Sequence, residues 1–299
     1  MSGSVPAQYA NLIRELRPNT EKLELLGAGD INEVILVDNT EVFRFPKDTN
    51  GRQMLAYEVE ILRELAGKLA LQIPEVKQLS DDNSYAIFDY VPGRVLEIQD
   101  IINFPTDQKS DLGHRLATLI SELNKILNIE HTKALRAHYT PWFEDDETYY
   151  RTKLDWGKET THYSLYVSYY EAFLKRQNKV GKPQEFVLHG DLHSGNLLFN
   201  DRQELTGIID FGDCGPGTIY NELRQLYRLG EDIVQVIIAE LNGRFGNIDM
   251  ELIRINAIMH EISILLRPES QPPHYNSRAE VAKELLVMWL GVDWEDKLD

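Results

Sequence analysis

The polar segment VLHGDLHSGNLLFN, residues 187–200, holds a dense group of side chains that could do chemistry. Asp191 and Asn196 lie five positions apart in it, and Asp210 ends the apolar run that follows. Turn-forming residues join the two apolar runs, so we expect a hairpin that brings Asn196 beside Asp210. One amide oxygen and one carboxylate suit Mg²⁺ that is also held by phosphate oxygens and water. Asp191 would then remain free to act as a base.

Two histidines flank this aspartate and suggest a different kind of site. His189 and His193 form a His-x-Asp-x-His pattern that could present metal ligands on one side of a strand, as in a metal-dependent phosphohydrolase. Such a site needs further ligands, and the remaining histidines are scattered without metal-ligand spacing. We therefore expect His189 to be structural, with a hydrogen bond near Asp210, and His193 to stabilise its loop.

The elements that must position these residues differ along the chain. Residues 23–47 alternate in the manner of three strands joined by a glycine turn and an Asp-Asn turn. Residues 52–69 have apolar positions three and four apart, which predicts a helix, and residues 84–93 predict another strand that ends at Pro-Gly. The first part of the chain is therefore expected to be a sheet with one helix.

The later part of the chain is mostly helical in pattern. Only residues 186–210 interrupt the helices, with short strands. The first of these helices has Ser110 or Asp111 as its expected N-cap. The fold class is therefore α+β, with a small antiparallel-sheet lobe followed by a large helical lobe. The expected lobes are residues 1–91 and residues 92–299.

The bulk properties exclude several classes of protein. The 299 residues include 42% hydrophobic and 26% charged residues, as in ordinary globular proteins. No apolar run reaches the roughly 18 residues of a membrane span, and the first residues lack the pattern of an export signal. The net charge of −17 argues against a nucleic-acid partner and favours a cationic one. The single cysteine, Cys214, fits a reducing environment, so we expect a cytoplasmic protein.

Several runs occur in the order typical of one enzyme family. They are GAGDINEVILV, VFRFPK, YEVEILREL and YAIFDYVPG, then HGD with Asn196 five residues after its aspartate, and IDFGD at the end of the next strand. Over residues 23–230 these runs resemble the aminoglycoside phosphotransferase family, in which glycine replaces the arginine of the eukaryotic protein-kinase motif. The resemblance implies a bilobal, protein-kinase-like fold. Within the family, FRFPK and IIDFGDCGPG look most like the branch that modifies the 2''-hydroxyl of aminoglycosides.

The resemblance also implies roles for individual residues. Asp191 resembles the catalytic base that accepts the proton of the substrate hydroxyl, and Asn196 and Asp210 look like the Mg²⁺ ligands. The residues implied to bind the nucleotide triphosphate, ATP or GTP, are Gly27, Gly29 and Asn32 in the phosphate loop, Arg44 and Glu58 near the phosphates, and Phe88, Asp89 and Val91 at the hinge.

Two positions depart from the family's pattern. Where the family often has Lys on the third strand, this chain has Arg44, and Lys47 three residues later projects to the opposite face by period-two alternation. We assign the phosphate contact to Arg44. Because Arg and Lys differ in geometry and hydration, the choice between ATP and GTP stays open. After the metal-binding segment, Glu222 stands in for a later Asp of the family.

The sequence therefore predicts a kinase that moves the γ-phosphoryl group to a hydroxyl of a small, cationic molecule, most of all an aminoglycoside. Macrolide, choline or amino-alcohol, homoserine and sugar-derivative kinases share the core and stay as alternatives, as does a nucleotide-binding pseudoenzyme. Carboxylates that could contact a cationic acceptor are Asp213, Glu222, Glu261 and the acidic run at residues 144–147. The acidic run could equally be a solvated helix end. We expect neither nucleic acid nor membrane as a partner.

Overall fold

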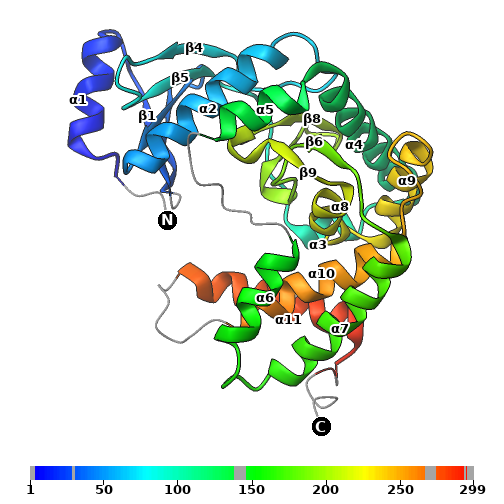
Figure 1. Ribbon diagram of the computed structural model, residues 1–299. Coiled ribbons are helices and arrows are strands. Elements are labelled where there is room, and N and C mark those ends of the chain that lie inside the picture. Colours follow the sequence, from blue (N-terminus) through cyan, green and yellow to red (C-terminus); the bar gives the residue numbers. More distant parts are fainter. Residues whose placement is uncertain (1–3, 29–30, 138–145, 267–273, 293, 295–299) are drawn as a thin grey trace. The chain divides into compact units, whose positions relative to one another are not determined.

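A five-stranded antiparallel sheet with the strand order β1-β2-β3-β5-β4 forms from the first part of the chain (Figure 1). The computed structural model describes residues 4–28, 31–137, 146–266, 274–292 and 294. The strands of the sheet are β1 (Leu23–Ala28), β2 (Asn32–Val37), β3 (Glu41–Pro46), β4 (Val76–Leu79) and β5 (Ala86–Asp89). The strands expected over residues 23–47 and 84–93 are confirmed, and β4 is an addition to them.

The hairpin between β2 and β3 depends on two left-handed residues. Asp38 and Asn39 have φ angles of 51° and 56°, and Asp and Asn tolerate this conformation better than most other residues. The register that follows pairs Arg44 with Val34 on β2 and with Ala86 on β5. Arg44 therefore lies on the middle strand of the sheet, where its side chain can reach elements packed over the sheet.

Two helices, α1 (Ala7–Leu16) and α2 (Thr49–Leu65), cover opposite faces of the sheet. Phe43 and Phe45 are buried on one face together with Ile13 of α1. Because side chains alternate along a strand, Arg44 points to the other face, where it donates hydrogen bonds to Glu58 of α2. The sequence analysis expected one helix on this sheet, and the structure adds a second, α1, whose Ile13 is buried against β3.

The segments around the polar loop are anchored by α4. The elements here are α4 (Thr106–Ile126), α5 (Ile129–Arg136), β6 (Glu185–Leu188), η1 (Ser194–Asn196), β7 (Leu197–Phe199), β8 (Leu205–Ile208), η2 (Phe211–Asp213) and β9 (Gly215–Thr218). Asn124 of α4 bonds the Val187 N–H at 2.9 Å and the Val187 carbonyl at 2.7 Å, which fixes the strand before the loop. The expected caps Ser110 and Asp111 were wrong, because α4 begins at Thr106. Its first turn is polar, so the apolar pattern did not reveal this start.

The remaining helices are α3 (Ile98–Ile102), α6 (Asp146–Trp156), α7 (Tyr163–Val180), α8 (Ile219–Tyr227), α9 (Glu231–Leu241), α10 (Met250–Leu265) and α11 (His274–Leu290). Among them α10 packs against α7, α8 and α11. The helical pattern over residues 221–242 is divided at Gly230, whose φ of 131° favours glycine. None of the described helices combines the length and apolarity that a membrane span requires.

The chain folds as two compact units. The sheet unit takes its residues from the ranges 1–97, 118–141 and 187–216, and the helical unit from 98–117, 142–186 and 217–299. The sheet unit thus includes both the five-stranded sheet and the β7–β8 hairpin, which together carry most of the predicted site residues. The division into lobes between residues 91 and 92 stays a prediction.

Candidate active site

The β7–β8 hairpin brings the two predicted metal ligands to neighbouring strands. Leu197 pairs with Ile208, and the Ile209 N–H donates to the Asn196 carbonyl at 3.1 Å. Asn196 ends the short turn η1, and Asp210 follows directly after Ile209 in a left-handed conformation with φ 68°. The expected hairpin is therefore confirmed, and it places Asn196 against the residue that precedes Asp210.

The Asn196 side chain is oriented by Asp191. Its Nδ2 donates to the Asp191 carbonyl at 2.8 Å and to Asp191 Oδ2 at 3.2 Å. Because both bonds use the nitrogen, the amide oxygen Oδ1 is the atom left for a cation. Oxygen atoms of Asn196 and Asp210 fit Mg²⁺, which takes few protein ligands and completes its shell with phosphate oxygens and water. The described residues contain no cluster of three or more His, Cys, Asp or Glu side chains that could hold a metal ion.

Arg44 links the sheet to the end of the hairpin. Its Nη1 donates to both carboxylate oxygens of Glu58, at 2.6 and 2.7 Å, and its Nη2 donates to Asp210 Oδ1 at 3.1 Å. Glu58 is 2% exposed and also accepts the Phe211 N–H at 3.1 Å. Burial opposes the charge of Arg44, but the charges of Glu58 and Asp210 outweigh it and raise the pKa of Arg44. The cation of the third strand is thus held between two carboxylates.

Asp191 is the candidate base, and its surroundings keep it ionised. Burial by itself would raise the pKa of Asp191. Hydrogen bonds from His193 and Asn196 act in the opposite direction, and the pKa of this carboxylate lies below its usual range. An ionised carboxylate at neutral pH can accept or orient the proton of a substrate hydroxyl.

His189 and Gly190 fix the backbone that precedes this base. His189 is fully buried, its Nε2 donates to the Ile209 carbonyl at 3.2 Å, and its ring centroid lies 4.6 Å from that of Phe211. Burial lowers the pKa of His189, so the ring is a neutral structural partner. Gly190 has a φ of +86°, and a Cβ there would overlap the Asp213 carbonyl oxygen. This close approach requires glycine at the second position of HGD.

Asp213 has a neighbour that no sequence motif indicated. Arg136, the last residue of α5, has its Nη2 3.9 Å from Asp213 Oδ1. Both side chains are mostly buried, and among the described residues neither Asp213 Oδ1 nor Arg136 Nη2 has a hydrogen-bond partner. Burial, with a contribution from the charge of Asp191, raises the pKa of Asp213 to about 7. Only the fold brings Arg136 here, because 77 positions of sequence separate it from Asp213.

The predicted hinge residues lie at the end of β5. Phe88 is 2% exposed and lies within the sheet. Asp89 and Tyr90 each use their N–H in a backbone hydrogen bond of 2.9 Å. The structure gives the Val91 N–H no hydrogen bond within the described part of the chain. This donor is therefore available to a nucleobase, and the contact itself stays a prediction.

The predicted phosphate loop is described in part. Gly29 lies outside the described residues. Gly27 lies on β1 opposite Val34, after a register shift that begins at Leu25. Asn32 begins β2, and its Oδ1 is buried without a hydrogen-bond partner among the described residues. The roles of Gly27, Gly29 and Asn32 toward a nucleotide stay predictions.

Two of the predicted acceptor contacts belong to the helical unit. Glu222 of α8 is 0% exposed and Glu261 of α10 is 1% exposed. Arg228 donates to both Glu261 carboxylate oxygens, at 2.6 and 2.9 Å, so this carboxylate already has a cationic partner. Glu144 and Asp145 of the acidic run lie outside the described residues. Contact of any of these acids with an acceptor stays a prediction.

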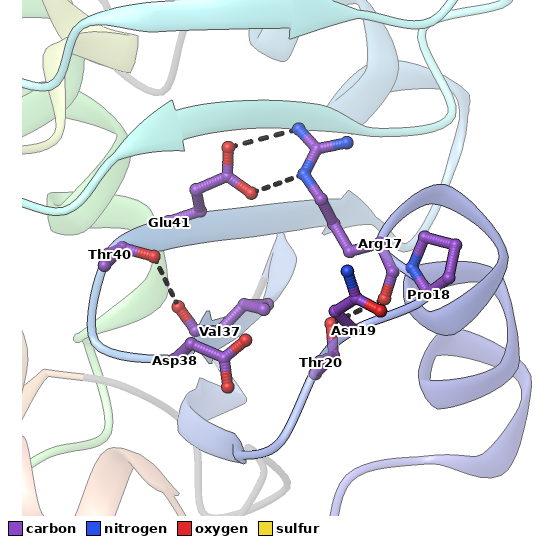
Figure 2. A pocket seen from close by; sticks show the side chains of 8 residues that line it. All are labelled: Arg17, Pro18, Asn19, Thr20, Val37, Asp38, Thr40 and Glu41. Atoms are coloured by element: carbon purple, nitrogen blue, oxygen red, sulfur yellow. Dashed lines mark hydrogen bonds and ion pairs between the residues drawn. The ribbon is translucent and has the colours of Figure 1, made fainter.

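A pocket of about 230 Å³ lies beside the turn between β2 and β3 (Figure 2). Arg17 donates to both carboxylate oxygens of Glu41 here, at 2.7 and 3.1 Å, so the charges of these two side chains are already matched. None of the predicted site residues lines this pocket. The lining residues are Arg17, Pro18, Asn19, Thr20, Val37, Asp38, Thr40 and Glu41.

Comparison with known proteins identifies a family and a fold. The model of the phosphotransferase enzyme family APH matches residues 22–275, which is most of the chain. The structure of the GDP complex of wild-type aminoglycoside 2'-phosphotransferase-IIIa is similar, with a TM-score of 0.75 and 24% identity over 94% of this chain and 97% of the other.

Two further structures extend this likeness. The GDP and kanamycin complex of APH(2'')-IIIa has a TM-score of 0.77 and 23% identity, over 97% of this chain and 100% of the other. The macrolide 2'-phosphotransferase MphH from Brachybacterium faecium has a TM-score of 0.64 and 15% identity, over 94% of this chain and 98% of the other. The kinase-like fold of these enzymes is therefore shared along nearly the whole chain.

Proposed function

Because the chain belongs to the APH phosphotransferase enzyme family, we propose that it transfers the γ-phosphoryl group of ATP or GTP to a hydroxyl of a small, cationic acceptor. One observation carries this proposal. The Asn196 side chain holds the Asp191 carboxylate, while the Asn196 backbone is bonded to the strand end that bears Asp210. The candidate base and the two candidate cation ligands thus belong to a single hairpin and its loop.

Asp191 would accept or orient the proton of the attacking hydroxyl. Phosphoryl transfer depends mainly on positioning and on electrostatic stabilisation, so the base must be ionised and held in one orientation. The lowered pKa of Asp191 and its bond from Asn196 meet these two requirements. A pseudoenzyme would be expected to lack one of these groups, and this chain keeps them together.

The guanidinium of Arg44 and a bound Mg²⁺ would neutralise the negative charge of the nucleotide phosphates. Arg44 would contact the phosphates, with its guanidinium oriented by the buried carboxylate of Glu58. Asn196 and Asp210 would hold Mg²⁺, which would neutralise phosphate charge when bound. Asp210 is 46% exposed, so a cation can reach its carboxylate without any opening of the core.

We assign the acceptor to the aminoglycosides. The chain has a net charge of −17, which favours an acceptor that carries several ammonium groups. A solved structure with the same fold holds kanamycin. Asp213 adds a carboxylate near the candidate base that an ammonium group could neutralise. A macrolide phosphotransferase also shares this fold, so macrolides belong in the test.

The test is a panel of aminoglycosides, macrolides and amino-alcohols, incubated with purified protein, Mg²⁺ and either ATP or GTP. Nucleoside diphosphate release and the mass of the acceptor are both measured. We expect an aminoglycoside to gain one phosphoryl group. Phosphorylation of an amino-alcohol or a macrolide instead would overturn the acceptor and keep the transfer reaction. No binding of either nucleotide would overturn both.

A further inference from the structure

We propose that His193 is a positioning residue for Asp191, which orients the carboxylate so that Oδ1 faces the acceptor hydroxyl. The inference rests on the proposed phosphotransfer. It adds His193 to Asn196 as a second residue that orients the Asp191 carboxylate. His193 Nε2 lies 3.4 Å from Asp191 Oδ2, and the two side chains are 35% and 28% exposed. The sequence pattern indicated a loop-stabilising role for His193 and gave no sign of this second contact.

The hydrogen bonds of the ring fix its tautomer. The Gly195 N–H donates to His193 Nδ1 at 3.0 Å. A nitrogen that accepts a hydrogen bond carries its lone pair, so the ring proton of neutral His193 must be on Nε2. Nε2 is the nitrogen that lies beside Asp191. The loop backbone therefore sets His193 as a donor toward the carboxylate.

The position of the ring is also fixed by the backbone. A Cβ on Gly195 would lie 2.7 Å from His193 Cε1 and 3.0 Å from Nδ1. The imidazole thus occupies the space directly over Gly195, and any larger residue there would displace it. The glycine and the histidine form one unit in which the loop determines where Nε2 points.

The capping role alone does not account for a histidine at this position. His193 is the N-cap of η1, and Ser, Thr, Asp and Asn are the residues that usually accept such a backbone bond. What histidine adds is a second nitrogen on the far side of the ring. In this structure that second nitrogen is the one directed at the candidate base.

The consequence for Asp191 concerns its two oxygens. Asn196 Nδ2 and His193 Nε2 both approach Oδ2, at 3.2 and 3.4 Å. Among the described residues, the contacts to this carboxylate all end on Oδ2. The Asn196 hydrogen bond and the longer His193 contact both favour one orientation of the carboxylate, in which Oδ1 is left to accept the hydroxyl proton.

Two substitutions separate the cap from the positioning contact. His193→Asn keeps an acceptor near the place of Nδ1 for the Gly195 N–H, but its side chain is too short to reach Asp191. His193→Gln places an amide N–H near the position of Nε2 and restores a donor to Asp191. We expect His193→Asn to lower kcat about 10- to 100-fold, as misplacement of a reacting group does. The nucleotide Kd, the acceptor KM and the Tm should stay near wild type.

We expect His193→Gln to regain most of kcat, even though it caps the loop less well. Wild-type kcat in His193→Asn would overturn the proposal. Losses of kcat in the two variants that parallel their losses of Tm would also overturn it. A wild-type protein without phosphotransferase activity would contradict the proposed function instead. The tautomer can be measured independently of activity by ¹⁵N NMR of labelled histidine. A proton on Nε2 alone supports the proposal, and a proton on Nδ1, with or without one on Nε2, overturns it.

Discussion

Arg44 and Asp210 are joined by a hydrogen bond of 3.1 Å, although 166 positions of sequence separate them. The same guanidinium also holds both oxygens of Glu58. A lysine ammonium is a point charge without the fork geometry of arginine. The arginine that replaces the family's usual lysine can therefore bridge the helix and the end of the hairpin at the same time.

The first prediction concerns this bridge. Arg44→Met should leave Glu58 buried without its cation and lower the free energy of unfolding by about 3–5 kcal/mol. Arg44→Lys should fold but raise the KM for the nucleotide by about tenfold, since one of its two contacts is lost. Chemical denaturation and steady-state kinetics measure the two effects.

The matched control for Arg44 is Lys47, on the same strand. Lys47 projects to the other face and lies 3.5 Å from Glu33, with 37% of its side chain exposed. Lys47→Met should change the nucleotide KM less than twofold, as exposed ion pairs contribute about 0–1 kcal/mol. A larger effect at Lys47 than at Arg44 would show that the phosphate contact was assigned to the wrong residue.

A second prediction separates the base from the metal ligand. Asp191→Ala should lower kcat by at least about 100-fold, within the usual range for a general base, while nucleotide binding is kept. Asp210→Ala should abolish the Mg²⁺-dependent increase in nucleotide affinity, as measured by titration with and without Mg²⁺. Near-normal kcat in Asp191→Ala would remove this residue from its role. Unchanged Mg²⁺ dependence in Asp210→Ala would place the metal elsewhere.

The hairpin and loop were predictable because their determinants are local. Asn196 lies five positions after Asp191, and the turn between two short apolar runs sets which strand ends meet. The β2–β3 hairpin was predictable for the same reason, from Asp38 and Asn39 at its turn.

The contacts that were missed depend on long-range packing. Arg136 lies beside Asp213, and Arg228 forms an ion pair with Glu261. The packing of helices brings each pair together, and neither pair has a characteristic spacing in the sequence. The second nitrogen of His193 was missed because a loop pattern does not give ring orientation. The helix α1 was missed because its burial becomes evident only once Ile13 meets the aromatic residues of β3.

The third prediction concerns the dependence of stability on pH. Burial raises the pKa of Asp213 to about 7, well above the ordinary value of an aspartate, so the folded protein keeps this proton where the unfolded chain releases it. The contribution to stability is complete below about pH 4 and is lost as the pH rises through about 7. Asp213→Asn removes this titration, so the Tm of the variant should rise relative to wild type over that interval. Thermal unfolding at a series of pH values measures the difference.

Asp155→Asn is the control for this pH series, because it removes a carboxylate whose side chain is 74% exposed. Its Tm should run parallel to that of wild type. If Asp213→Asn gave the same parallel curve, the buried carboxylate would not carry the pH dependence assigned to it.

The fourth prediction uses two glycines with the same backbone angle. Gly190 and Gly181 have φ values of 86° and 87°, but a Cβ on Gly181 would meet nothing within 4 Å. Gly181→Ala should therefore carry only the cost of a left-handed backbone, about 1–3 kcal/mol. Gly190→Ala should be more destabilising and should also lower kcat, because the Asp213 carbonyl must move. Equal losses of stability in the two variants would contradict the close packing described for Gly190.

The most direct measurement of the proposed reaction is a single-turnover experiment with nucleotide labelled in its γ-phosphate. Excess wild-type protein is mixed with Mg²⁺, the labelled nucleotide and an aminoglycoside, and the products are separated after one turnover. We expect the label on the aminoglycoside with wild-type protein, and intact labelled nucleotide with Asp191→Ala. Label released only as inorganic phosphate, or transfer that is equally fast in the variant, would contradict the assignment of Asp191 as the base of a phosphotransferase.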